Sequence, residues 1–118
     1  MSYFWRTHKG VKVLYADYRL LNSQQILTQL REIKELASNS HEPIKVLANI
    51  ENVALSSKIL PEVHEMGKEV VSEKKIQTGV IGMAGYKRII FKIYITVTKD
   101  ITKPFNSEEA VLNYLAAN

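Results

Sequence analysis

Apolar and polar positions alternate near the start of the chain in the way that a half-buried β-strand requires. Residues 3–7 are rich in aromatics, residues 8–10 (His-Lys-Gly) supply a turn, and Val11, Val13 and Tyr15 recur at every second position. Two short runs joined by such a turn are typical of a β-hairpin. The pattern therefore predicts a hairpin over roughly the first 17 residues.

A change of period marks the next element. Asn22 precedes Gln25 by three positions, which is the spacing of a capping box at a helix N-terminus. Apolar residues then return at helical spacing, namely Ile26, Leu27, Leu30, Ile33, Leu36 and Ala37. A group of turn formers ending in Pro43 follows, so we expect the helix to end before it.

The remaining segments continue this alternation of strands and helices. Residues 44–50 predict a central strand buried on both faces, and residues 76–83 a second one, in which Gly79 and Gly82 mark places of close approach. One helix is predicted between these two strands, with apolar residues on one face at Ile59, Val63, Met66 and Val70. A further helix is predicted over residues 86–99. Pro104 and Phe105 form a short extended piece, and Asn106 with Glu109 predicts another capping box, which opens a final helix.

Strands that alternate with helical crossovers predict an α/β fold. We expect a mixed, mostly parallel sheet of four to five strands, opened by the β-hairpin and with helices on both faces. A chain of 118 residues suits a single domain spanning residues 1–118.

Composition excludes several kinds of chemistry. The chain has no cysteine, which rules out disulfides, thiolate nucleophiles and thiolate-bound metals. Its histidines, His8, His41 and His64, have no spacing that would gather a metal, and no cofactor motif is present, so we predict neither. The first residues do not form a signal peptide, and no apolar run approaches the roughly 18–20 residues of a membrane span. The cytoplasm is the default location, with peripheral membrane contact left open.

Four segments together resemble a known family. They are Asp17-Tyr18, Asn49-Ile50-Glu51-Asn52, the run from Gly82 to Ile90, and the run from Lys103 to Ala110. In this order and spacing they resemble the short STAS-like (SpoIIAA-like) bacterial domains, over essentially the whole chain. The resemblance implies a non-enzymatic regulatory module similar to anti-sigma-factor antagonists. Such antagonists bind a kinase-like partner protein and are switched by phosphorylation of a serine that follows a central strand.

Ser56 and Ser57 stand where that phosphoacceptor would lie, after the central strand and before the second predicted helix. The antagonist loop reads approximately Asp-Ser-Ser-Gly, whereas residues 52–58 here have neither the acidic lead-in nor the glycine. A serine at this place also suits a helix N-cap. Phosphoacceptor and simple cap therefore remain two interpretations of the same residues.

Polar residues also follow the ends of two strands. The carboxyl ends of parallel strands meet at one edge of a sheet, where ligands commonly bind. Asp17, Glu51 and Asn52 fall at this edge. Asp17 and Glu51 could form an acid/base pair, but no nucleophile or phosphate loop accompanies them, so we predict no enzyme. The alternative for Asp17 and Asn52 is a hydrogen bond to loop backbone in an Asx-type turn.

A second candidate site combines backbone and positive charge. Gly85 precedes Lys87 and Arg88 at the start of the predicted helix 86–99, an arrangement that suits an anion or a lipid headgroup. Packing of that helix on the sheet is the alternative, since its circumference is largely apolar. The same apolar surface leaves a homodimer contact or a lipid contact open.

Two functional hypotheses follow. The first is a regulatory module with an unknown protein partner, acting through residues 52–58. The second is a carrier of a small apolar ligand or anionic lipid that uses helix 86–99. The aromatic residues Tyr3, Phe4 and Trp5 beside Arg6 could stack on bases, but such residues in a hairpin more commonly pack on the sheet, so no nucleic acid is predicted.

Overall fold

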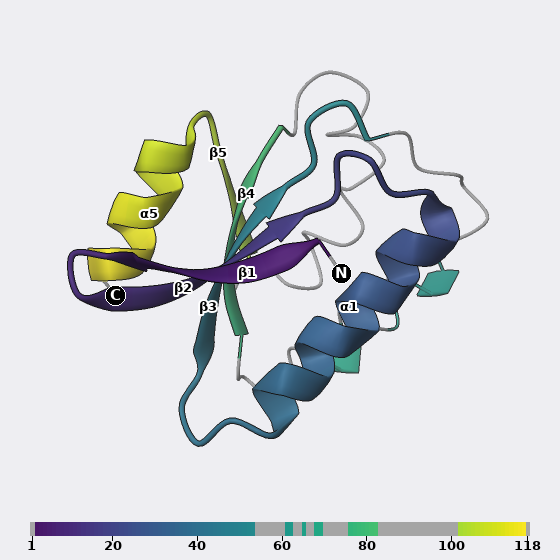
Figure 1. The fold of residues 1–118 in the computed structure, drawn as a ribbon, viewed down its shortest axis with the longest axis horizontal. Coiled ribbons are helices and arrows are strands. Elements are labelled where there is room, and N and C mark those ends of the chain that lie inside the picture. The colour runs from purple at the N-terminus through teal and green to yellow at the C-terminus, as the bar shows by residue number, and fades with distance from the viewer. Residues whose placement is uncertain are drawn as a thin grey trace.

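Five strands form one mixed sheet in the order β1-β2-β3-β4-β5 (Figure 1). The computed structural model describes residues 2–53, 61, 62, 65, 68, 69, 76–82 and 102–117. The strands are β1 (Tyr3–His8), β2 (Val11–Asp17), β3 (Ile44–Asn49), β4 (Ile76–Ile81) and β5 (Thr102–Phe105). β1 is antiparallel to β2, and every other neighbouring pair is parallel. The predicted mixed sheet is confirmed, with β3 at its centre.

The hairpin turn consists of Lys9 and Gly10. Their φ angles are 50° and 78°, so both central residues lie in the left-handed region that a type I′ turn requires. This turn continues the right-handed twist of the strands and sets the register, in which His8 faces Val11. The predicted hairpin is confirmed, and it places the aromatic residues of β1 at the edge of the sheet.

Helix α1 (Ser23–Ser38) covers one face of the sheet (Figure 1). It begins with the predicted capping box: the Gln25 amide donates to Asn22 Oδ1 and the Asn22 amide donates to Gln25 Oε1, each at 2.9 Å. Its apolar stripe is buried against the inner residues of β2, β3 and β4, in a cluster that includes Ile26, Ile33, Ala37, Leu14, Ala16, Val46 and Val80. The helical period of the sequence therefore corresponds to a real buried face.

Helix α5 (Glu108–Ala117) covers the opposite face, so helices lie on both faces as expected (Figure 1). Val111, Leu112 and Leu115 pack there in a cluster with Val13, Tyr15, Leu47 and Ile81. Gly79 makes this packing close, since a Cβ at that position would lie 2.5 Å from Val111 Cγ1. The close approach expected at Gly79 is thus confirmed.

The predicted cap of this last helix is wrong by one residue. The helix begins at Glu108, and the side chain of Ser107 accepts a 3.2 Å hydrogen bond from the Ala110 amide. Ser107, not Asn106, is therefore the N-cap residue. Both residues suit a cap locally, and the end of β5 and the docking of α5 decide between them.

Part of the segment between β3 and β4 can also be placed. Residues 61, 62, 65, 68 and 69 are helical, in agreement with a second helix there. Arg31 of α1 forms a 3.3 Å ion pair with Glu62, and Lys34 pairs with Glu69. The predicted apolar positions of this helix, and the predicted helix 86–99, lie outside the described residues.

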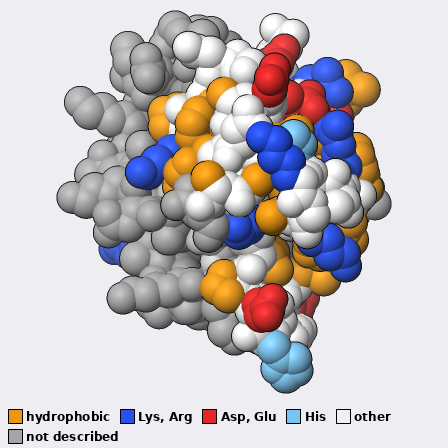
Figure 2. Space-filling model, turned by 90° about the vertical axis from the view of Figure 1, so that its left-hand side faces the viewer, with side chains coloured by type: hydrophobic (Ala, Val, Ile, Leu, Met, Phe, Trp, Pro, Cys, Tyr) orange, Lys and Arg blue, Asp and Glu red, His pale blue; other side chains and the backbone are white. Residues whose placement is uncertain are grey.

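Charge on the α5 side of the molecule is dispersed. Figure 2 shows Lys and Arg side chains on this side separated by apolar and uncharged ones, within the part that is coloured. Lys103 is exposed on β5, with its ammonium 5.6 Å from the centre of the Tyr114 ring. Among the helices of the described residues, none is long and apolar enough to cross a membrane.

Candidate functional site at the carboxyl edge of the sheet

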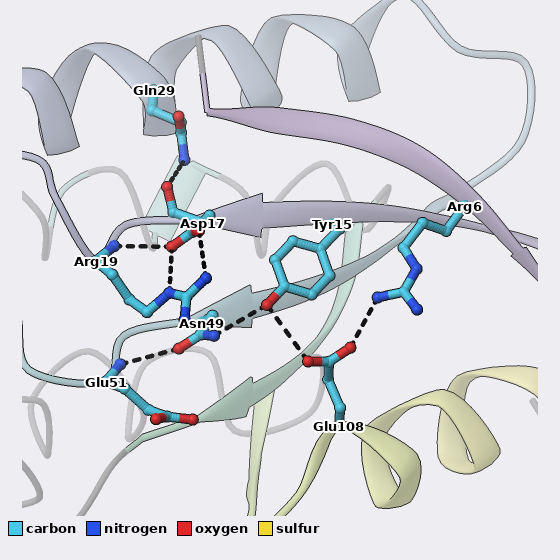
Figure 3. Close-up of polar contacts among 8 residues, drawn as sticks. All are labelled: Arg6, Tyr15, Asp17, Arg19, Gln29, Asn49, Glu51 and Glu108. Atoms are coloured by element: carbon cyan, nitrogen blue, oxygen red, sulfur yellow. Dashed lines mark hydrogen bonds and ion pairs between the residues drawn. The ribbon is translucent and has the colours of Figure 1, made fainter.

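The strand register aligns the carboxyl ends of β2 and β3. Asp17 is paired with Asn49 and Asn49 with Ile81, so one row of residues closes this edge of the sheet. Glu51 and Asn52 follow the end of β3 after one intervening residue and are exposed. Figure 3 shows Asp17 and Glu51 at this edge, and Asn52 follows Glu51 in the chain, so the three residues lie where the sequence places them.

Asp17 is engaged by Arg19, two residues further along. The guanidinium donates to both carboxylate oxygens, with Nη2 at 2.8 Å from Oδ2 and Nε at 3.0 Å from Oδ1, and the Arg19 amide also donates to Oδ1. The amide bond is the Asx-type turn that we expected for Asp17. Hydrogen bonding from Arg19 lowers the pKa of Asp17, against the opposing effect of partial burial. Asp17 is therefore a fixed carboxylate, which makes it unsuited to donate a proton in an acid/base pair with Glu51.

This pair predicts a pH dependence of stability. Because the pKa of Asp17 is lower in the folded protein than its ordinary value of 3.8, its contribution is present above pH 4 and is lost as the pH falls through the lower folded value. Both side chains are partly exposed, at 27% for Asp17 and 46% for Arg19, so we expect less than about 1 kcal/mol. Arg19→Ala should move the Asp17 pKa up towards 3.8 in an NMR titration. An unchanged pKa in that variant would show that Arg19 does not set it.

Behind this pair lies a buried polar network centred on Asn49. Asn49 is 2% exposed; its amide group donates to the Tyr15 hydroxyl at 2.9 Å, and its Oδ1 accepts from the Glu51 amide at 3.0 Å. The Tyr15 hydroxyl in turn donates to Glu108 at 3.5 Å, and Glu108 pairs with Arg6 at 2.7 Å (Figure 3). The network therefore ties β1, β2, β3 and the first turn of α5 to the loop that follows β3.

The described start of that loop, residues 50–53, forms a turn with its own backbone hydrogen bond. The Val53 amide donates to the Ile50 carbonyl at 3.1 Å, and Asn52 has a left-handed φ of 58°, a conformation that asparagine tolerates. Gly82 lies directly behind the loop: its φ is 92°, and a Cβ there would lie 2.4 Å from the Glu51 nitrogen. The approach predicted at Gly82 is confirmed, and its neighbour is the backbone of the candidate site itself.

Gln29 braces the same edge from the α1 side. Its side chain is fully buried, donates to the Asp17 carbonyl at 3.2 Å and accepts from the Ser2 amide at 3.0 Å. The loop after β2 also contains Leu20, which follows Arg19 and is 96% exposed. The carboxyl edge thus presents a leucine and charged groups above a hydrogen-bonded polar network.

Several of the predicted site residues cannot be compared with this geometry. Ser56, Ser57, Gly85, Lys87 and Arg88 all lie outside the described residues. In contrast, Arg19, Tyr15 and Glu108 are site residues that the sequence did not indicate. The Arg19 contact has a local signal, an arginine two positions after a strand-end aspartate, whereas the contact between Tyr15 and Glu108 joins residues 93 positions apart.

The described histidines, His8 and His41, are not part of a metal-binding cluster. His8 lies 3.2 Å from Asn113 Oδ1, and His41 is exposed in the loop before β3. Over the described ranges, no group of three or more His, Asp or Glu side chains could hold a metal ion.

Comparison with known proteins supports the fold. The architecture, a five-stranded sheet with one antiparallel pair and helices on both faces, is that of a STAS-like α/β fold. It is similar to the solved structure of an anti-sigma-factor antagonist (STAS) domain protein from Planctomyces limnophilus, with a TM-score of 0.60 and 13% sequence identity. The match covers 97% of each chain. No family model matches the sequence, and no curated protein sequence matches it significantly.

Proposed function

We propose that this protein is a non-enzymatic regulatory module that binds a protein partner through its carboxyl edge. We define this surface by Arg19, Leu20, Glu51 and Asn52. We propose that residues 54–58, which lie outside the described residues, contribute to the same interface. The proposal combines the fold similarity with the state of the polar groups at that edge.

The observation that carries the proposal is that Asp17 and Asn49 at this edge are hydrogen-bonded to other groups of the same chain. Asp17 is held by Arg19, and Asn49 is shared between Tyr15 and the Glu51 amide. Groups fixed in this way shape a surface, whereas a catalytic centre needs groups that can exchange protons or bonds with a substrate. The exposed Leu20 beside Arg19 supplies an apolar contact and a charge, both of which a protein interface uses.

The similarity to a STAS domain protein supports this choice, because the two chains match over nearly their whole lengths. In line with the anti-sigma-factor antagonists, we propose that Ser56 or Ser57 is the phosphoacceptor. A phosphoryl group adds almost two negative charges close in sequence to Glu51. It would therefore release a partner whose contacting surface is acidic.

The interface is tested by replacing Leu20. The variant Leu20→Glu should reduce recovery of the partner at least about tenfold, as expected when a contact at the centre of an interface is lost. Because Leu20 is 96% exposed, the melting temperature of the variant should equal that of the wild type. The matched control is Leu36→Glu, which adds the same charge on α1, at a leucine that is 38% exposed. Equal recovery with both variants would contradict an interface at the carboxyl edge.

The switch is tested by native mass spectrometry of the protein purified gently from its own cells. We expect a fraction of the wild type to carry the mass of one phosphate group, and the double variant Ser56→Ala/Ser57→Ala to lack it. An adduct of lipid or small-molecule mass on most of the protein would instead favour the carrier hypothesis.

A further inference from the structure

β1 is the edge strand of the sheet, and no described strand pairs with its outer side. Figure 1 looks onto this edge, and no other described element lies in front of β1. The Asp17 amide donates to the Ser2 carbonyl at 2.8 Å. This bond shows which residues of β1 direct their backbone N–H and C=O groups towards β2. Backbone groups alternate in an antiparallel pair, so the N–H and C=O of Tyr3, Trp5 and Thr7 point away from β2. The edge therefore offers three consecutive donor and acceptor pairs.

This edge also carries exposed aromatic side chains. Phe4 is 53% and Trp5 is 43% exposed, and they lie on opposite faces of the strand. Phe4 stacks on Tyr15 with ring centres 5.1 Å apart, and the Arg6 guanidinium lies 5.4 Å from the centre of the same Tyr15 ring. β1 contains no proline, and its arginine, Arg6, is engaged by Glu108 and the Tyr15 ring of its own chain.

We propose that β1 pairs with β1 of a second copy of this chain, antiparallel and with the two-fold axis at Trp5. In this register Trp5 faces Trp5 of the second copy, and Tyr3 faces Thr7. These are the residues whose backbone groups point outward, so each facing pair can exchange both hydrogen bonds. The two sheets then join into one continuous sheet across the dimer.

The side chains explain why the occupant is a second copy. The same register brings Phe4 opposite Arg6 of the second copy in a pair without backbone hydrogen bonds, where side chains come closest. Each guanidinium then has the Tyr15 ring of its own chain on one side and a phenylalanine ring on the other, a favourable cation–π arrangement. On the other face the two Trp5 rings meet. The edge is thus complementary to itself, as a two-fold interface requires.

The first test uses a proline that affects only the outer side of the strand. Thr7→Pro removes an outward N–H and leaves the bonds between β1 and β2 in place, as edge strands allow. Analytical ultracentrifugation should show the wild type dimerising, and a dissociation constant at least about tenfold larger for Thr7→Pro. Thr7→Val, which keeps the N–H, should dimerise like the wild type. A wild type that remains a monomer at high concentration, or a dimer unaffected by Thr7→Pro, would overturn the proposal.

The second test reads the register and does not depend on how Thr7→Pro folds. The chain has no cysteine, so two single variants, Phe4→Cys and Arg6→Cys, introduce one thiol each. Facing residues without backbone hydrogen bonds have Cα atoms about 4.5 Å apart, within the range of a disulfide. Under oxidising conditions a disulfide dimer should form when the variants are mixed and not with either variant alone. Equal crosslinking of each variant alone would show a different register and refute the two-fold axis at Trp5.

Discussion

Replacing Gly82 by alanine is expected to lower the free energy of unfolding by about 3 kcal/mol, the sum of an unfavourable backbone conformation and a steric clash. The φ of 92° is one that residues with a Cβ rarely adopt. In addition, the new Cβ would lie 2.4 Å from the Glu51 nitrogen and 2.7 Å from its Cα. Backbone cannot move aside as a flexible side chain can, so the loop after β3 must shift.

Gly10→Ala is the matched control for this prediction. Gly10 also has a positive φ, 78°, but nothing lies within 4 Å of the position that its Cβ would take. The free energy of unfolding of Gly10→Ala should therefore fall only by the cost of the backbone conformation, about 1–2 kcal/mol. Urea unfolding of the two variants separates the two contributions. Equal losses would show that the contact between Gly82 and Glu51 has no energetic weight.

The second large effect is expected at Asn49. Asn49→Leu keeps a buried side chain of similar size but removes the acceptor of the Glu51 amide and the donor to Tyr15. Leaving two such groups without partners costs roughly 1–3 kcal/mol each, so we expect a loss of about 2–6 kcal/mol. Hydrogen exchange at the Glu51 amide should also become faster, because its acceptor is gone.

Tyr15→Phe separates the two bonds of Asn49. It removes the hydroxyl that Asn49 contacts and leaves the bond to the Glu51 amide, so the loss should be smaller, about 1–2 kcal/mol, with the exchange at Glu51 unchanged. The double variant should lose less than the sum of the single ones, since they share one hydrogen bond. Strict additivity would mean that this bond contributes nothing to stability.

If both predictions hold, the carboxyl edge is rigid before any partner arrives. Gly82 supports the Glu51 backbone from behind, and Asn49 fixes its amide. A surface ordered in advance loses little conformational entropy on binding. This is the property that a regulatory binding module needs at its interface, and it links the stability of the loop to the proposed function.

Over the described residues, the sequence predicted the local structure correctly except at the cap of α5, for identifiable reasons. The hairpin followed from a period of two around Lys9 and Gly10, and α1 from a period of 3.6 behind the capping box at Asn22. The cap of α5 was misplaced at Asn106 because Asn106 and Ser107 carry equally good local signals. Local pattern does not decide between adjacent residues when both can cap.

The candidate site was predicted in part. Asp17, Glu51 and Asn52 could be grouped because parallel strands bring their carboxyl ends to one edge. The serines and the Gly85, Lys87, Arg88 group remain predictions. The role of Asn49 as the centre of a network was not evident, since its partner Tyr15 is 34 positions away.

By itself, therefore, the sequence determined the described strands and helices of this protein and the edge at which its polar residues collect. These depend on interactions between residues a few positions apart, whose periodicity can be read along the chain. The tertiary structure alone decided which polar groups are paired, that Gly82 lies against Glu51, and that Glu108 reaches Tyr15. Such contacts depend on strand register and on the docking of α5 on the sheet, which join distant residues that no local pattern connects.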